Sequence, residues 1–176
     1  MKLTAVMEKY ILHWGEMGAR WGVNRSVAQI HSLLYLAVRP MTAEEIAETL
    51  GIARSNVSTS LRELQSWGLV RLIHVKGDRR DHFEALGDLW ETFFTIVENR
   101  KRREIDPTLG VLRDCCLMAE DDQETLPETK QRIVAATEFL ENLLNWYDQI
   151  KRLPRTVLMG VLALGNKVEQ LLRLAK

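Results

Sequence analysis

The residues best suited to chemistry gather on one predicted helix, residues 54–67. At about 100° per residue, Val57, Leu61 and Leu64 share one face of this helix. The opposite face and its flanks carry arginines, small hydroxyls and one amide: Arg54, Ser55, Asn56, Ser58, Thr59, Arg62 and Ser66. A solvated helix is ordinarily rich in glutamate and lysine, whereas small polar side chains let a helix approach base edges and phosphates closely. Because arginine also makes bidentate bonds to guanine, the helix is predicted to contact DNA.

A second group of cations follows at a glycine-centred turn between two short apolar stretches, 69–75 and 81–85. Its basic members are Lys76, Arg79 and Arg80. The two stretches are predicted to pair as a hairpin with a basic tip. Arginines at a hairpin tip are often merely solvated, but a tip that directly follows a DNA-reading helix favours contact with phosphates or the minor groove.

The charge of the chain is unevenly distributed. The total is zero, with 24 basic and 24 acidic residues among 176. Residues 54–80 contain six basic and two acidic side chains, a local charge of +4 that the rest of the chain balances with −4. Nucleic-acid binding depends on where charges lie rather than on their sum, so a basic centre in an acidic surround is compatible with one DNA-binding face.

The elements around these residues follow the pattern of a helix-turn-helix. Thr42 and Glu45 form a Thr-x-x-Glu capping box, which predicts the start of a short helix that ends at Gly51. The helix at 54–67 follows after a brief turn and is closed by Gly68. Two short helices joined by a tight turn that contains glycine define the motif.

Two helices are predicted before the motif. The first has an apolar or small stripe at intervals of three and four: Leu3, Val6, Met7, Tyr10, Ile11, Trp14, Gly18 and Trp21. The second, at 25–38, is apolar on most sides and is stopped by Pro40. A helix of that composition is expected at the centre of a core.

Helical periodicity returns after Gly87 and ends in the charged run 98–104. Asp106 and Pro107 resemble an N-cap followed by proline in the first turn, opening a helix to about residue 118. The acidic stretch 119–126 is predicted to be a loop, and prolines open two further helices, at 127–153 and from 154 onward. The expected fold class is mainly α with a small β-hairpin, and the expected domains are 1–105 and 106–176.

The last two predicted helices carry wide apolar stripes. One contains Ile133, Ala136, Leu140, Leu143, Tyr147 and Ile150, and the other contains Val157, Val161, Leu164, Val168, Leu171 and Ala175. An ordinary hairpin within one chain is the simplest arrangement for these helices. Such a hairpin leaves part of two wide stripes exposed, so a second subunit is predicted to cover them, giving a homodimer held by the C-terminal helices.

The sequence shows no catalytic constellation, and we predict a protein that is not an enzyme. His13, His31, His74 and His82 have no ligand spacing with one another or with the cysteines, so no metal and no cofactor are expected. The adjacent Cys115 and Cys116 fit inert packing better than a redox sensor. Because no signal peptide or membrane-spanning run is present, a cytoplasmic location without membrane association is expected.

The motif and its flanks resemble a known family. The matching residues are Trp21-Gly22, Arg25, Ala28 and Ile30, then 42–47, Gly51-Ile52, 55–58 and 61–64, and finally 76–81 with Glu84-Ala85. Together they resemble winged helix-turn-helix regulators of the MarR superfamily, and specifically their GbsR branch, whose first members were associated with glycine betaine. The resemblance is dense over 21–90 and thin beyond about residue 118.

The resemblance implies a transcriptional regulator, with repression the expected sign. It would act as an operator-binding homodimer on double-stranded, palindromic DNA, with helix 54–67 in the major groove and the wing at 76–81 on the backbone or minor groove. One departure concerns Ala53, where many relatives have a serine that caps the recognition helix. A lost cap costs ~1 kcal/mol, and either Ser55 or a shifted helix start could compensate.

Two alternatives remain at this point. The winged helix could serve as a protein–protein interaction module, although such a module would expose apolar residues where this chain has Ser55, Thr59 and Arg62. The five tryptophans, Trp14, Trp21, Trp67, Trp90 and Trp146, could form an aromatic cage for a quaternary ammonium effector. Trp14, Trp21 and Trp90 lie on apolar stripes, so core packing is the favoured interpretation, and the sequence names no effector.

Overall fold

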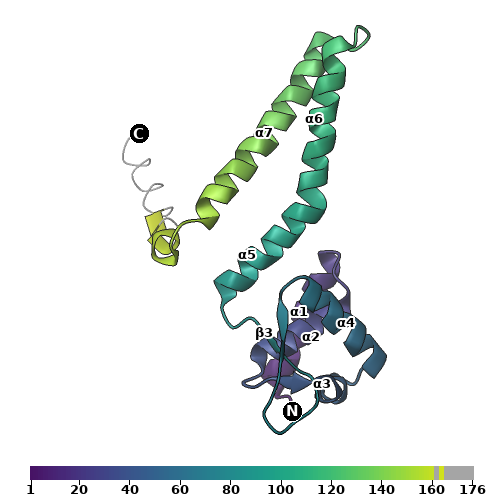
Figure 1. Cartoon of the computed structure of the whole chain (residues 1–176), viewed down its shortest axis with the longest axis vertical. Helices are drawn as coiled ribbons and strands as arrows, with labels where there is room; N and C mark the ends of the chain where they lie inside the picture. The colour runs from purple at the N-terminus through teal and green to yellow at the C-terminus, as the bar shows by residue number, and fades with distance from the viewer. Residues whose placement is uncertain (161–162, 165–176) are drawn as a thin grey trace. The chain divides into compact units, whose positions relative to one another are not determined.

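The computed structural model describes residues 1–160 and 163–164. The chain divides into two compact units, Met1–Arg100 and Lys101–Lys176, and Figure 1 shows the helices and strands of each. Among the described residues the first unit contains α1 (Ala5–Arg20), α2 (Arg25–Leu36), β1 (Met41–Thr42), α3 (Ala43–Leu50), α4 (Arg54–Ser66), β2 (Val70–Ile73), β3 (His82–Ala85) and α5 (Leu89–Arg100). The second contains η1 (Lys101–Ile105), α6 (Asp106–Asp121) and α7 (Pro127–Lys151). The expected fold class, mainly helical with a small sheet, is confirmed.

Helix α2 is the centre of the first unit. Val27, Ile30, Leu33 and Leu34 are buried along it, as its apolar composition predicted. The core continues onto α3 through Ile46, onto the sheet, and onto α4 through its apolar face. This core fixes α4 against the rest of the unit and leaves the polar side of α4 outward.

Helix α1 packs on α2 through small residues. Ile11, Gly15 and Gly18 are its buried residues, and a Cβ atom built on Gly18 would lie only 2.5 Å from the Cβ of Ala28. The predicted apolar stripe of α1 is therefore only partly inside, because Val6 is 79% exposed and Trp21 is 57% exposed. The close approach of two helix backbones, rather than large side chains, makes this contact.

The helix-turn-helix forms as its capping signals predict. Thr42 accepts a hydrogen bond from the backbone of Glu45, and Glu45 accepts one from the backbone of Thr42, which completes the capping box of α3. Gly51 ends α3 at φ 65°, a left-handed conformation that a glycine adopts without steric cost. Helix α4 then begins at Arg54, close to the predicted boundary.

The sheet has three antiparallel strands in the order β1-β3-β2. Strands β2 and β3 form the predicted hairpin, with Arg71 opposite Glu84, but both are shorter than the expected 69–75 and 81–85. The two-residue β1 was not predicted; Met41 pairs with Phe83 and Thr42 with His82. The wing is thus attached to the start of α3 by strand pairing.

The second unit differs from the sequence expectation at the start of α6. Ile105 occupies the N-cap position with a helical backbone, so the prediction that Asp106 is the N-cap is wrong, whereas Pro107 does lie in the first turn. The five residues of η1, just before α6, form a π-helical turn. Helix α6 also continues to Asp121, which shortens the predicted loop to 122–126. Lys130 supports this longer helix by donating to the carbonyl oxygens of Ala119 and Asp122.

Helices α6 and α7 pack on each other without forming a substantial core. In this unit only Leu109, Thr137 and Leu158 are buried among the described residues. Residues 155–160 and 163–164 are helical. Of the predicted final stripe, Val161, Val168, Leu171 and Ala175 lie outside the described residues. No helix in the described part of the chain is long and apolar enough to cross a membrane.

His31, on α2, is a buried imidazole in the first unit. Burial lowers its pKa from 6.5 to about 4, and its Nε2 atom has no hydrogen-bond partner among the described residues. The unfolded chain takes up a proton near pH 6.5, whereas the folded protein resists protonation down to about pH 4. The contribution of His31 to stability is therefore complete above pH 6.5 and is lost as the pH falls through this window.

Acidification from pH 7 to pH 5 is expected to reduce the free energy of unfolding by about 2 kcal/mol through His31. Urea denaturation at the two pH values measures this difference. His31→Gln should remove most of the pH dependence, and His74→Gln, at an exposed position, should leave it unchanged. If His31→Gln loses as much stability on acidification as the wild-type protein, another titratable group causes the pH dependence.

Candidate nucleic-acid interface

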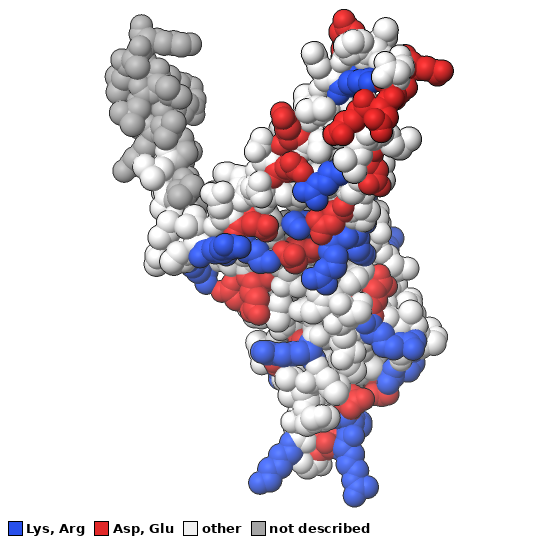
Figure 2. All heavy atoms as spheres, turned by 45° about the horizontal axis from the view of Figure 1, so that its top comes forward, with Lys and Arg blue, Asp and Glu red and all other residues white. Residues whose placement is uncertain are grey.

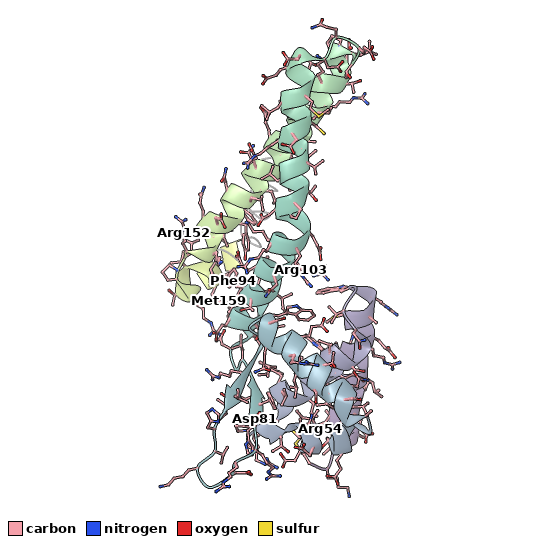
Figure 3. All side chains as sticks on the ribbon, turned by 45° about the vertical axis from the view of Figure 1, so that its right-hand side comes forward. Arg54, Asp81, Phe94, Arg103, Arg152 and Met159 are labelled. Carbon is pink, nitrogen blue, oxygen red and sulfur yellow. The ribbon has the colours of Figure 1, made fainter. Side chains whose placement is uncertain are left out.

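The outer face of α4 is polar, as the helical wheel predicted. Val57, Leu61 and Leu64 are buried in the core, and Ser60 is buried beside them. The opposite side is exposed at Arg54, Ser55, Asn56, Thr59, Arg62 and Ser66, and Ser58 is half-buried. Figure 3 places Arg54 at the start of α4 and Asp81 on the β2–β3 hairpin. The structure therefore brings most of the predicted residues of α4 to one accessible surface.

The N-terminus of α4 is stabilised by an ion pair rather than by a side-chain cap. Ala53 is the N-cap residue and makes no side-chain capping bond, and Ser55 does not replace it. Arg54 instead donates from Nε to Glu44 on α3 over 2.7 Å, and its guanidinium also bonds to the hydroxyl of Ser58. The hydrogen bond from Arg54 lowers the pKa of Glu44. Arg54 thus links the two helices of the motif.

Asn56 links α4 to α2. Its Nδ2 atom donates to the hydroxyl of Ser26 over 3.0 Å, and its Oδ1 atom accepts from Ser60 over 3.4 Å. The amide is exposed but is already held on both sides. Asn56 therefore contributes to the placement of α4 as well as to its outer surface.

Arg62 differs from Arg54 because it has no carboxylate partner within the described residues. Its Nη2 atom donates to Thr59 one turn earlier over 3.4 Å. A single weak bond to a hydroxyl leaves the guanidinium charge uncompensated and most of its donors available. These are the properties required for bidentate contact with a base edge.

The wing tip is organised around Asp78. Its carboxylate accepts hydrogen bonds from the backbone nitrogen of Arg80 over 3.0 Å and from the Arg80 guanidinium over 2.5 Å. These hydrogen bonds hold the pKa of Asp78 well below its usual range. The buried His82 ring lies beside the pair, with Nδ1 2.9 Å from the carbonyl oxygen of Arg80. With Gly77 at φ 88°, this network gives the tip a defined shape.

Half of the six basic residues of 54–80 are neutralised within the chain. Arg54, Arg71 and Arg80 pair with Glu44, Glu84 and Asp78 at 2.7, 2.6 and 2.5 Å. Arg62, Lys76 and Arg79 make no ion pair within the described residues. The predicted local charge of +4 therefore overstates the charge that this region presents. Figure 2 shows lysine and arginine side chains projecting at the lower end of the view, with acidic side chains interspersed above them.

The helix-turn-helix and the wing form one electrostatic group. Beyond the hydrogen bond from Arg54, the charge of Arg80 also lowers the pKa of Glu44. A wing arginine and the first turn of α3 are therefore close enough to interact. The residues that sequence reasoning missed are the partners that arrange the cations: Ser26, Glu44, Asp78 and Glu84. Only Glu84 carried a usable signal, since a correct hairpin register places it opposite Arg71.

The other sequence expectations concern metal ions, cysteines and tryptophans. No group of three metal-ligating side chains occurs within the described residues. Both cysteines are free and half-buried, and the Sγ atom of Cys116 lies 3.3 Å from the hydroxyl of Thr137.

The tryptophans have separate surroundings. Trp14 stacks on Tyr10 at 5.6 Å between ring centroids, and Trp90 stacks on Phe94 at 6.1 Å. Trp67 packs against the core, whereas Trp21 and Trp146 are exposed. Core packing, the favoured interpretation for Trp14, Trp21 and Trp90, is therefore wrong for Trp21, whereas Trp14 and Trp90 are half-buried.

A helix-turn-helix followed by a hairpin that pairs with a strand before the motif defines a winged helix-turn-helix domain. Residues 15–81 match the family model described as MarR family.

Two relatives of similar length come from Bacillus subtilis (strain 168). The HTH-type transcriptional repressor GbsR is 25% identical over 146 residues, which cover 80% of this chain and 79% of the relative. The HTH-type transcriptional repressor OpcR is 22% identical over 137 residues, which cover 76% of this chain and 74% of the relative.

A solved structure described as a transcriptional regulator shares the fold. It superposes with a TM-score of 0.59 at 19% identity, over 81% of this chain and 93% of the other.

Proposed function

We propose that this protein is a sequence-specific DNA-binding transcriptional regulator of the GbsR type, and not an enzyme. The outer surface of α4 and the wing carries the proposal, because it offers three uncompensated cations, Arg62, Lys76 and Arg79, among small polar side chains. In this assignment α4 enters the major groove and the wing touches the backbone or minor groove. The repressor names of the two relatives, together with the extent of the match to GbsR, support repression as its sign of regulation.

We further propose that the protein acts as a homodimer through its C-terminal helices, with assistance from α1. On α7, Ile133, Leu140, Leu144 and Tyr147 are half-buried. A neighbouring strip, here called the open face of α7, consists of Phe139, Leu143 and Trp146, which are 68%, 46% and 59% exposed. At about 100° per residue these three side chains share one side of the helix without an intervening charge. A second copy of the chain would bury this face, and its twofold symmetry would select a palindromic operator.

Salt dependence of binding tests the proposal. Because Arg62 is assigned to a base edge, Lys76 and Arg79 in each copy give four phosphate contacts in a dimer, so log K should fall against log salt with a slope of about −4. The operator for this titration would be selected from genomic fragments by the full-length protein. A slope near zero, or no DNA binding at low salt, would favour the protein–protein interaction module instead.

Substitutions of Arg62 and of Arg79 are expected to weaken DNA binding in different ways. Arg62→Ala should cost about 1–3 kcal/mol on the operator and relax preference at one base pair in each half-site. Arg79→Ala should weaken operator and random DNA by similar factors and flatten the salt slope by about one unit per lost contact. Fluorescence anisotropy with matched operator and random duplexes measures both effects. If the two outcomes are exchanged, the assigned roles of helix and wing are reversed.

A further inference from the structure

The end of α5 contacts the C-termini of two other helices. Trp21 is the C-cap residue of α1 and Trp67 is the C-cap residue of α4. Arg100 donates to the carbonyl oxygen of Trp21, and Asn99 donates to the carbonyl oxygen of Trp67 over 2.8 Å. The last carbonyls of a helix have no partner within the helix. Two consecutive residues of α5 therefore satisfy such groups on α1 and on α4.

We propose that Asn99 is a positioning residue that holds the recognition helix α4 at the angle required for operator binding. This proposal rests on the proposed function, because it assigns to Asn99 an effect on DNA binding. In the proposal Asn99 acts through α4 and does not itself touch the DNA. It requires that the contact with α4 be specific and that the rest of α5 be fixed. Both conditions are met by the packing of the first unit.

The Asn99 amide is held in one orientation. Its Nδ2 atom carries two hydrogens, and it donates both to the carbonyl of Trp67 and to the carbonyl of Thr95 on its own helix, each over 2.8 Å. The other carbonyls at the end of α4 are satisfied locally, since Leu69 donates to Leu64 and Gly68 donates to Gln65. The hydrogen bond from Asn99 differs from these local bonds, because it comes from α5, about 30 residues later in the chain.

Helix α5 is itself anchored beside this contact. Ile96 and Trp67 both pack on the core cluster of the first unit. A Cβ atom built on Gly68 would lie 3.9 Å from Thr95, so α5 lies across the turn that ends α4. The guanidinium of Arg100 also lies 5.6 Å from the centre of the Trp21 ring, and its charge complements the negative end of the α1 dipole.

The two ends of α4 are thus held by different elements. Asn56 bonds to Ser26 of α2 near the start, and Asn99 of α5 binds the C-cap. Loss of the second contact would let α4 pivot about its first turn while its apolar face stays in the core. A pivot displaces base-reading side chains such as Arg62. Contact with phosphates tolerates a wider range of orientations, so the effect should be larger on the operator than on random DNA.

The test compares wild type with Asn99→Ala and with Asn99→Asp, which has the same shape but cannot donate to the Trp67 carbonyl. Asn145→Ala, an exposed asparagine on α7, is the matched control. Operator affinity should fall about tenfold in both Asn99 variants, because both lose the hydrogen bond to the Trp67 carbonyl, and affinity for random DNA should change less than about twofold. Amide exchange of residues 66–69 should accelerate, while circular dichroism at the assay temperature stays unchanged.

A purely structural role would lower thermal stability without changing the ratio of operator to random affinity in the folded protein. The proposal is overturned if Asn99→Ala binds the operator as wild type does, or if it loses operator and random DNA by the same factor. A wild-type protein that binds no DNA would instead refute the proposed function. The two failures are therefore distinguishable.

Discussion

Leu143→Glu is expected to convert the protein from dimer to monomer at micromolar concentration and to weaken operator binding at least about a hundredfold. Leu143 lies at the middle of the open face of α7, between Phe139 and Trp146. A carboxylate placed there would be buried without a partner in the proposed interface, and an unpaired buried charge opposes association strongly. Each half of the operator would then be bound independently, so the gain from simultaneous binding would be lost.

Val134→Glu provides the matched control for this variant. Val134 is 43% exposed on the same helix, and at about 100° per residue it lies on the side opposite Leu143. Light scattering and anisotropy should find this variant dimeric and fully active. If Leu143→Glu remains a dimer, or if both variants dissociate equally, the open face of α7 is not the subunit interface.

Gly18→Ala is expected to destabilise the first unit by about 2 kcal/mol or more, although alanine ordinarily favours a helix over glycine. The new methyl group would meet the Cβ of Ala28 at 2.5 Å. That atom is bonded directly to the backbone of α2, so relief requires the two helices to separate. Urea denaturation measures the loss.

Gly110→Ala supplies a control of opposite sign. Gly110 lies within α6, and a Cβ atom there would meet nothing within 4 Å among the described residues. This variant should gain about 0.5–1 kcal/mol from reduced backbone entropy in the unfolded chain. If Gly18→Ala also stabilises the protein, the α1–α2 contact is looser than described.

Local signals in the sequence predicted the elements that carry the candidate site. The capping box at Thr42 and Glu45 and the left-handed glycine at Gly51 depend on neighbouring residues alone, so they could be recognised before the fold was known. The face of α4 followed from periodicity for the same reason. Strand β1 could not be predicted, because two residues carry no periodic signal and their conformation depends on pairing with β3, some 40 residues later.

The ion pairs that neutralise the basic residues could not be predicted from the sequence, for a similar reason. Arg54 and Glu44 are ten positions apart, and their ion pair exists only because α3 and α4 pack together. On α7 the apolar stripe was predicted as one surface, with Leu140 and Leu143 together. In the structure Leu140 is half-buried and Leu143 belongs to the open face. A periodic pattern shows that residues share one side of a helix. The position of the neighbouring helix decides which of those residues are buried and which stay exposed.

The pairing of Arg54, Arg71 and Arg80 with acids of the same chain has a consequence for target search. Sequence-independent attraction to DNA grows with the number of phosphates neutralised, and it sets how long a protein dwells on each random site. Internal ion pairs would reduce that attraction while leaving the proposed base readout through Arg62 intact. A genome offers about 10⁶–10⁹ competing sites. Shorter dwell times on these sites would therefore leave a larger fraction of the protein free to sample new ones. If the protein acts as proposed, the acids on α3 and in the wing would shorten the search for an operator without contacting DNA.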